Sequence, residues 1–186
     1  MSFHQDLHLM YVLIKGENKN MNKTQKIVTL GVLTALYVVL SFCMKFTVIG
    51  NIQIDLGYVV FAVACCVFGA WGFVVGGFGC MLESILFSAY GFSISWFVAN
   101  VVIGLACGTV YMLNKKMRYS MIVNMFMTLL IVFFGVGLIK TVIECNLYSI
   151  PFEVKIVKNS VATVIDTLAM WIGLWIYPLI KKHIRF

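Results

Sequence analysis

A stripe of polar side chains runs through the last apolar segment of the chain. Asn159, Thr163 and Asp166 lie at positions i, i+4 and i+7, a spacing that places them on one face of a helix. Lys155 extends this stripe, and Lys158 lies on an adjacent face. Polar groups among apolar residues are costly, and they are candidates for ligand binding or helix–helix contact. We expect Lys158 and Asn159 to bind substrate, and the deeper Asp166 to anchor one helix to another.

Two further pairs share this helical spacing. Trp96 and Asn100 lie four residues apart, and so do Lys140 and Glu144. We expect Trp96, Asn100 and Lys140 to contact substrate. Two alternatives remain open: Asn100 could form an interhelical hydrogen bond, and Lys140 could form only a local ion pair, in the less favourable Lys-before-Glu order. For Glu83, alone among large apolar residues, we expect structural pairing.

The chain lacks the usual signatures of catalysis. Its three histidines lie near the termini, which argues against a metalloprotease helix, and no phosphate-binding P-loop is present. The six cysteines lie mostly in apolar runs without a CxxC pair, where cysteine behaves as a small apolar residue. We therefore predict no catalytic residues, no metal, no cofactor and no enzymatic activity.

The elements that position these residues must lie in a membrane. The chain is 62% hydrophobic and only 11% charged, with a mean hydropathy of +0.99. A soluble domain of this size could not bury so much apolar surface. A crossing needs roughly 20 apolar residues. Hydropathy predicts an all-α bundle of six transmembrane helices, at about 26–44, 55–70, 71–88, 95–113, 120–143 and 156–180.

The basic residues predict the orientation of this bundle. Ten of the 14 Lys and Arg residues fall on one side of the six predicted crossings. They are Lys15, Lys19, Lys23, Lys26, Lys115, Lys116, Arg118, Lys181, Lys182 and Arg185. The positive-inside rule makes that side, and with it both termini, cytoplasmic. We expect residues 1–23 to be an extension outside the 24–186 membrane domain, and we expect Met21 to be the true start of the protein.

The loops on the opposite side, about 45–55, 88–94 and 144–155, combine polar and aromatic residues. This composition suits a lid over a small-molecule site, or alternatively an ordinary interfacial aromatic belt. We expect Asp55 and Tyr90, from the first two loops, to contact substrate.

Small residues four apart indicate close helix packing in lipid. The pairs Gly72/Gly76, Gly104/Gly108 and Gly31/Ala35 have this spacing. We expect them to be contact surfaces, within the bundle or toward a partner helix.

Three segments carry a resemblance to a known family. They are GVLTALYVVLSF (31–42), IDLGYVVFAVACCVFGAWGFVVGGFGCML (54–82) and SWFVANVVIGLACGTVY (95–111). Over residues 24–182 the chain resembles the substrate-binding S components of energy-coupling factor (ECF) transporters, which capture vitamins in prokaryotic membranes. The resemblance implies a six-helix bundle with an outward pocket, a transmembrane coupling subunit and two ATPase subunits. It also implies that Gly31 and Ala35 dock on the coupling subunit, although alanine is usual at the first position.

The family motifs do not identify the ligand. Outer aromatic residues and lysines suggest a folate- or flavin-like vitamin, and we expect no nucleic-acid partner. The main alternative is a membrane scaffold that shares this bundle but binds no ligand. A self-sufficient transporter or channel would instead show inverted repeats or interrupted helices.

Overall fold

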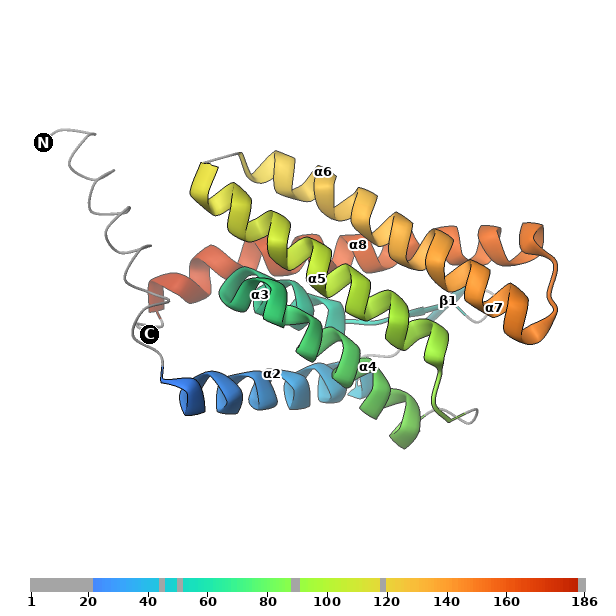
Figure 1. The fold of residues 1–186 in the computed structure, drawn as a ribbon, viewed down its shortest axis with the longest axis horizontal. Helices are drawn as coiled ribbons and strands as arrows, with labels where there is room; N and C mark the ends of the chain where they lie inside the picture. The colour runs from blue at the N-terminus through green and yellow to red at the C-terminus, as the bar shows by residue number, and fades with distance from the viewer. Residues whose placement is uncertain (1–21, 44–45, 50–51, 88–90, 118–119, 184–186) are drawn as a thin grey trace, which may run out of the picture.

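The protein is a bundle of long helices, seen in a computed structural model (Figure 1). The structure describes residues 22–43, 46–49, 52–87, 91–117 and 120–183. Tyr90 and nearly all of the predicted extension therefore lie outside the described residues. The elements are α2 (Lys23–Cys43), β1 (Phe46–Ile49), β2 (Ile52–Ile54), α3 (Gly57–Phe68), η1 (Gly69–Trp71), α4 (Gly72–Phe87), α5 (Ile94–Met117), α6 (Met121–Val132), η2 (Phe133–Lys140), α7 (Thr141–Tyr148) and α8 (Phe152–His183).

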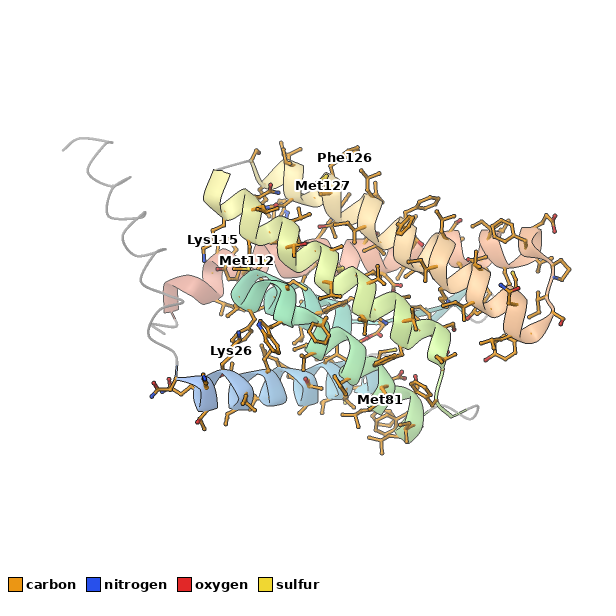
Figure 2. All side chains as sticks on the ribbon, in the orientation of Figure 1. Lys26, Met81, Met112, Lys115, Phe126 and Met127 are labelled. Carbon is orange, nitrogen blue, oxygen red and sulfur yellow. The ribbon has the colours of Figure 1, made fainter. Side chains whose placement is uncertain are left out.

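The helices follow the predicted apolar segments closely, and the outside of the bundle is apolar. Among the described residues, five segments are long and apolar enough to cross a membrane. They are Lys23–Cys43, Gly57–Phe87, Ile94–Lys115, Met121–Tyr148 and Phe152–Ile180. Large apolar side chains point outward, such as Ile27 (70% exposed) and Phe126 (59% exposed, Figure 2). Such a surface is stable in lipid rather than in water, so the membrane prediction is confirmed.

The segment Gly57–Phe87 is divided by a tight turn, η1. Gly69 has a φ of 61°, in the left-handed region that glycine adopts readily. Beyond the turn, α4 folds back along α3, since a Cβ added at Gly76 would lie 2.2 Å from Cζ of Phe61. Neither α3 (12 residues) nor α4 (16 residues) reaches the roughly 20 residues typical of a crossing. The count of six crossings therefore stays a prediction.

The bundle has two distinct ends. At one end, which we call the basic end, the starts of α2 and α6 lie near the last turns of α5 and α8 (Figure 1). The turn η1 also lies there, since the Lys26 Nζ is 4.6 Å from the ring centroid of Trp71. The other end, the hairpin end, carries β1, β2 and the turn between α7 and α8.

At the hairpin end, part of the first predicted loop forms a small sheet. Strands β1 and β2 pair antiparallel, with Phe46 opposite Ile54 and a register shift between Thr47 and Ile49. Strand β2 lies against α8. These are the only strands among the described residues, and the sequence analysis had expected none.

The glycine pairs differ in what they contact. A Cβ at Gly104 would lie 2.5 Å from the Phe73 Cα, and one at Gly108 would lie 2.2 Å from the Gly69 carbonyl oxygen. These helices touch backbone to backbone, which confirms the predicted close packing. By contrast, nothing lies within 4 Å of a Cβ added at Gly31. Gly31 and Ala35 are both exposed on the outer face of α2.

Polar contacts join α6 to its neighbours nearer the basic end. Tyr111 on α5 shares a hydrogen bond with Thr128 on α6, and the Asn114 amide donates to the side chain of Asn124. The Trp171 Nε1 on α8 donates to the Met125 carbonyl oxygen at 3.0 Å. These bonds hold the helices together in the half of the bundle nearer the basic end. The polar residues near the hairpin end are left to form the site.

Candidate functional site

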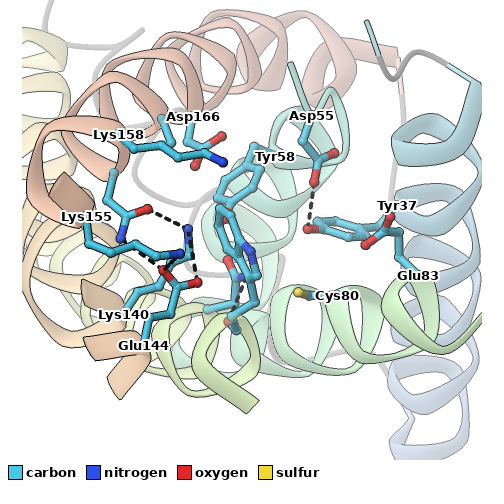
Figure 3. Close-up of a pocket in the computed structure, with 14 residues that line it drawn as sticks. Tyr37, Asp55, Tyr58, Cys80, Glu83, Lys140, Glu144, Lys155, Lys158 and Asp166 are labelled. Atoms are coloured by element: carbon cyan, nitrogen blue, oxygen red, sulfur yellow. Dashed lines mark hydrogen bonds and ion pairs between the residues drawn. The ribbon is translucent and has the colours of Figure 1, made fainter. Parts of the chain in front are cut away.

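A cavity of about 230 Å³ opens within the bundle toward the hairpin end (Figure 3). Its wall is formed by residues of α2, α3, α4, α5, η2, α7 and α8, together with Asp55 before α3. The lining residues are Tyr37, Asp55, Tyr58, Cys80, Glu83, Trp96, Asn100, Lys140, Glu144, Lys155, Lys158, Asn159, Ala162 and Asp166. Most of them are polar or charged, which is unusual inside a membrane bundle and marks a functional site.

One wall is a connected network centred on Glu144. Its carboxylate lies 3.0 Å from the Lys155 Nζ and 3.8 Å from the Lys140 Nζ. The Ser95 hydroxyl donates to it at 3.3 Å and the Asn159 amide at 3.4 Å. The expected Lys140–Glu144 ion pair is present, and it forms part of a larger cluster of two cations and one anion.

Asn159 holds this network together from α8. Its Oδ1 accepts from the Lys140 Nζ at 2.9 Å, and its Nδ2 donates to the Thr141 Oγ1 at 2.8 Å. All three residues are at least 95% buried. A buried, fully bonded amide of this kind orients its neighbours, so Asn159 positions Lys140 as well as lining the cavity.

The Lys140 ammonium also covers an aromatic ring. Its Nζ lies 3.6 Å from the ring centroid of Trp96, close enough for a cation–π contact. That face of Trp96 is therefore occupied by the protein itself. A planar ligand would have to use the other face or displace Lys140.

Asp55 connects the cavity to the start of α3. Its Oδ1 accepts from the Ser41 hydroxyl at 2.6 Å and from the Gly57 backbone N–H at 2.8 Å. Its Oδ2 accepts from the Tyr37 hydroxyl at 3.2 Å. Burial raises the pKa of the Asp55 carboxyl above its usual range, and the hydrogen bonds from Ser41 and Gly57 oppose this shift. Asp55 thus caps α3 and ties it to α2.

Three buried polar atoms in the cavity wall have no hydrogen-bond partner. They are Tyr58 Oη, Asn100 Oδ1 and Asp166 Oδ2. No other side-chain atom of this kind occurs among the residues that the structure describes. Leaving such an atom unpaired costs about 1–3 kcal/mol, so each of the three is open to a hydrogen bond with a molecule in the cavity.

Comparison with known proteins assigns the chain to a family. A sequence model of the family described as ECF-type riboflavin transporter, S component, matches residues 21–183. The chain belongs to this family. It is a membrane-embedded substrate-capture subunit of an ECF-type importer.

The fold agrees with a solved member of the wider group. A crystal structure of the S component for biotin from an ECF-type ABC transporter superposes with a TM-score of 0.62. It is 16% identical in sequence, and the match covers 87% of this chain and 95% of that one. At this identity the likeness shows that the two proteins share a fold.

This S component brings most of the predicted site residues together. Six of the seven line the cavity: Asp55, Trp96, Asn100, Lys140, Lys158 and Asn159. Tyr90, the seventh, lies outside the described residues. That these residues bind substrate stays a prediction, and Asp55 and Asn159 have clear structural bonds as well.

Asn100 and Asp166 differ in detail from what was expected of them. The Asn100 Nδ2 donates to the Trp96 carbonyl oxygen at 3.0 Å, within its own helix, which leaves Oδ1 facing the cavity. Asp166 was expected to be a helix–helix anchor, yet its Oδ2 lines the cavity without a hydrogen-bond partner.

Sequence reasoning missed the tyrosines of this S component. Tyr37 and Tyr58 lie in apolar runs, and both are 1% exposed. No helical polar stripe marks them, and only the contact between α2 and α3 directs them to the cavity. Glu144 and Lys155 were noticed in the sequence as polar residues at helical spacing, and Lys155 was considered as a partner for an anionic ligand group, but neither was among the predicted site residues.

Metal-ligating side chains do not gather into an ion site among the described residues. No group of three or more His, Cys, Asp or Glu side chains could hold an ion in the part of the chain that the structure describes.

Proposed function

We propose that this S component captures a flavin-like molecule in its cavity, with riboflavin as the first candidate. It would pass that molecule to a transmembrane coupling subunit driven by two ATPase subunits, in a prokaryotic cell membrane. The single observation that carries the proposal is the set of unpaired atoms of Tyr58, Asn100 and Asp166. The family description, which names riboflavin, agrees with it.

The unpaired atoms of Asn100 and Tyr58 can bond a ligand that has both hydrogen-bond donors and acceptors. The Asn100 Oδ1 can only accept, so it needs an N–H or O–H group from the ligand. The Tyr58 hydroxyl can donate to a carbonyl oxygen. A flavin ring carries an imide N–H between two carbonyl groups, so its edge offers both partners side by side.

The charged wall favours a flavin over a folate. Lys140 and Lys155 are already balanced in part by Glu144, and Asp166 adds a further carboxyl group nearby. The carboxylates of a folate would meet those acidic groups at close range. The hydroxyl groups of a ribityl chain both donate and accept, and they fit such a mixed wall without adding charge.

The outer face of α2 supports a docking role for Gly31 and Ala35. Both are exposed, and nothing within the chain approaches Gly31. The other glycine pairs are in contact with neighbouring helices of the same chain. The surface at Gly31 and Ala35 is therefore available to a helix of another subunit. We propose that the coupling subunit docks there.

We further propose six crossings with both termini in the cytoplasm. The turn η1 lies beside Lys26 and Met112 at the basic end, which supports α3 as an inward crossing and α4 as the return crossing outward. The basic residues at that end support its cytoplasmic location.

Riboflavin binding by the purified chain tests the proposed ligand. Quenching of riboflavin fluorescence, with folate and biotin as competitors, gives the affinity, and native mass spectrometry shows any co-purified molecule. We expect Asn100→Leu to weaken binding about tenfold, the value of one hydrogen bond. Asn146→Leu is a matched control, because the Asn146 amide makes the same bond to the carbonyl four residues earlier, at 2.9 Å, but lies outside the cavity.

The outcomes separate the alternatives. Tight riboflavin binding that only Asn100→Leu weakens supports the proposal. Preferential binding of folate or biotin would overturn the flavin assignment but keep ligand capture. If no vitamin bound or co-purified, the protein would instead be a scaffold that assembles partners.

A further inference from the structure

Buried residues recur at an unusual interval along the helix formed by α6, η2 and α7. Thr128, Val132, Val136, Lys140 and Glu144 are spaced four apart, and each is at most 6% exposed. They keep facing the groove between α5 and α8 over the whole distance. Thr128 contacts Tyr111 of α5 near the basic end, and Glu144 contacts Ser95 of the same helix near the hairpin end.

A regular α-helix could not keep these residues aligned. With 3.6 residues per turn, each step of four residues overshoots a full turn by roughly 40°, so four steps add roughly 160°. Glu144 would then face nearly the opposite side from Thr128. Lys140 would also have turned well away from Trp96 and Asn159.

The segment η2, Phe133–Lys140, removes this drift because it is a π-helix. Hydrogen bonds from i to i+5 widen each turn, so more residues are used per revolution. Single-turn π-bulges are the common form, and they occur often at functional sites. Here eight residues adopt the π form, and the segment ends on Lys140 itself.

A glycine lets the widened turns lie against α5. A Cβ added at Gly135 would lie 2.5 Å from the Ile103 Cγ1 and 3.4 Å from the Ala99 carbonyl oxygen. The π segment is therefore in contact with α5 at its own backbone. Any larger side chain at this position would push it away.

We propose that the π-helical segment Phe133–Lys140 is a positioning element of the binding site, which turns Lys140 and Glu144 into the cavity. Neither the wall network nor the cover over Trp96 would form if these residues were on a regular α-helix. The proposal concerns the geometry of the wall. Only the riboflavin measurements below rest on the proposed function.

Deletion of one residue within η2 should return it to a regular helix, in which the fifteen remaining steps from Thr128 turn Glu144 by roughly 60° from its present direction. Phe134 is suitable because it is 54% exposed and contributes nothing to the cavity. Deletion of Ile122, which is 74% exposed, is the matched control. It shortens the same helix at its start, where the preceding turn can adapt and no later residue rotates.

Thiol cross-linking measures the rotation without any ligand. In a cysteine-free background, a short bis-methanethiosulfonate should join cysteines placed at Ser95 and Glu144, and likewise at Asn114 and Asn124. We expect deletion of Phe134 to reduce the first cross-link several-fold and to keep the second, which lies before η2. Deletion of Ile122 should keep both. An unchanged yield of the Ser95–Glu144 cross-link without Phe134 would overturn the proposal.

Two further variants keep the test decisive if the deletion disturbs folding. In the first variant, Phe134 is deleted and one alanine is inserted after Leu138, which restores the number of residues in η2. The Ser95–Glu144 cross-link should then return to its original yield, and failure to return would contradict the proposal. Gly135→Ala should reduce the Ser95–Glu144 cross-link several-fold, and Ile103→Ala in the same chain should recover it. If Gly135→Ala left the cross-link unchanged, the proposal would also be overturned.

Riboflavin affinity then links this geometry to binding. Deletion of Phe134 should weaken binding about tenfold, and deletion of Ile122 should leave it unchanged. If the unaltered protein bound no riboflavin while the cross-links behaved as expected, the ligand assignment would fail and the positioning role would stand. Unchanged riboflavin affinity after deletion of Phe134 would overturn the positioning role.

Discussion

The polar residues of the cavity in this S component are of two kinds. Some have all their hydrogen bonds within the protein, and others have a buried atom without a hydrogen-bond partner. Asn159 belongs to the first kind, because its amide is bonded to Lys140, Thr141 and Glu144. Tyr58 and Asp166 belong to the second. The first kind should matter for both stability and affinity, and the second for affinity alone. This difference makes the two roles separable by experiment.

We expect Tyr58→Phe to lower affinity without lowering stability. Its hydroxyl is buried and makes no well-formed hydrogen bond, although the Asn100 side chain lies close to it, so removing it costs the empty protein little but removes a hydrogen bond to the ligand. Riboflavin affinity should fall about tenfold, while the thermal unfolding midpoint stays level or rises. Tyr111→Phe is the control: its hydroxyl bonds Thr128, so stability should fall and affinity hold. A clear loss of stability in Tyr58→Phe would contradict this role.

The titration of Asp55 predicts a pH dependence. Because burial raises its pKa in the folded protein, the neutral carboxyl is favoured there. Folding stability should therefore fall as pH rises from the ordinary value of 3.8 through the raised pKa. Asp55→Asn removes this titration, so its unfolding midpoint should fall less over the same range. Glu153→Gln, which removes an exposed carboxylate, is the control. Parallel curves for Asp55→Asn and the unaltered protein would rule out the effect.

At the scale of elements, glycine serves two different surfaces. Gly76 and Gly79 lie against the rings of Phe61 and Tyr37, where there is no space for a side chain. Gly31 lies on an open face of α2. The same residue type therefore closes the bundle in one place and exposes a smooth face in another. Sequence spacing alone could not distinguish these two uses.

We expect Gly31→Leu to block assembly while the subunit itself remains intact. The new side chain meets nothing within the chain, so folding and riboflavin binding should be unchanged. Copurification with the coupling and ATPase subunits should fall at least tenfold, because close helix approach is lost. Gly76→Leu is the contrasting variant, since its side chain would collide with Phe61 and reduce the yield of folded protein. Normal assembly of Gly31→Leu would place the docking surface elsewhere.

At the scale of the whole molecule, hydropathy was sufficient to predict the helices but not their interruptions. Composition predicts the helical segments within a few residues, because lipid demands long apolar helices. The π-helix η2 and the β1–β2 pair were not foreseen. Both depend on contacts with other elements: η2 lies against Ile103, and β2 lies against α8. Six predicted site residues line one cavity because polar side chains in lipid have few other places to go. Tyr58 was missed because its neighbours in sequence are apolar.

The number of crossings and their direction can be settled by labelling single cysteines in whole cells. In a cysteine-free background, Phe92→Cys, near the hairpin end, should react with an impermeant maleimide added outside. Ser120→Cys and Trp71→Cys should react only after the membrane is opened. Trp71 is decisive, because it lies on the turn η1 and is 53% exposed. With six crossings it reaches the cytoplasm and is labelled, whereas a single crossing by Gly57–Phe87 would leave it within lipid and unlabelled on both sides. Labelling of Ser120→Cys from outside would reverse the proposed orientation.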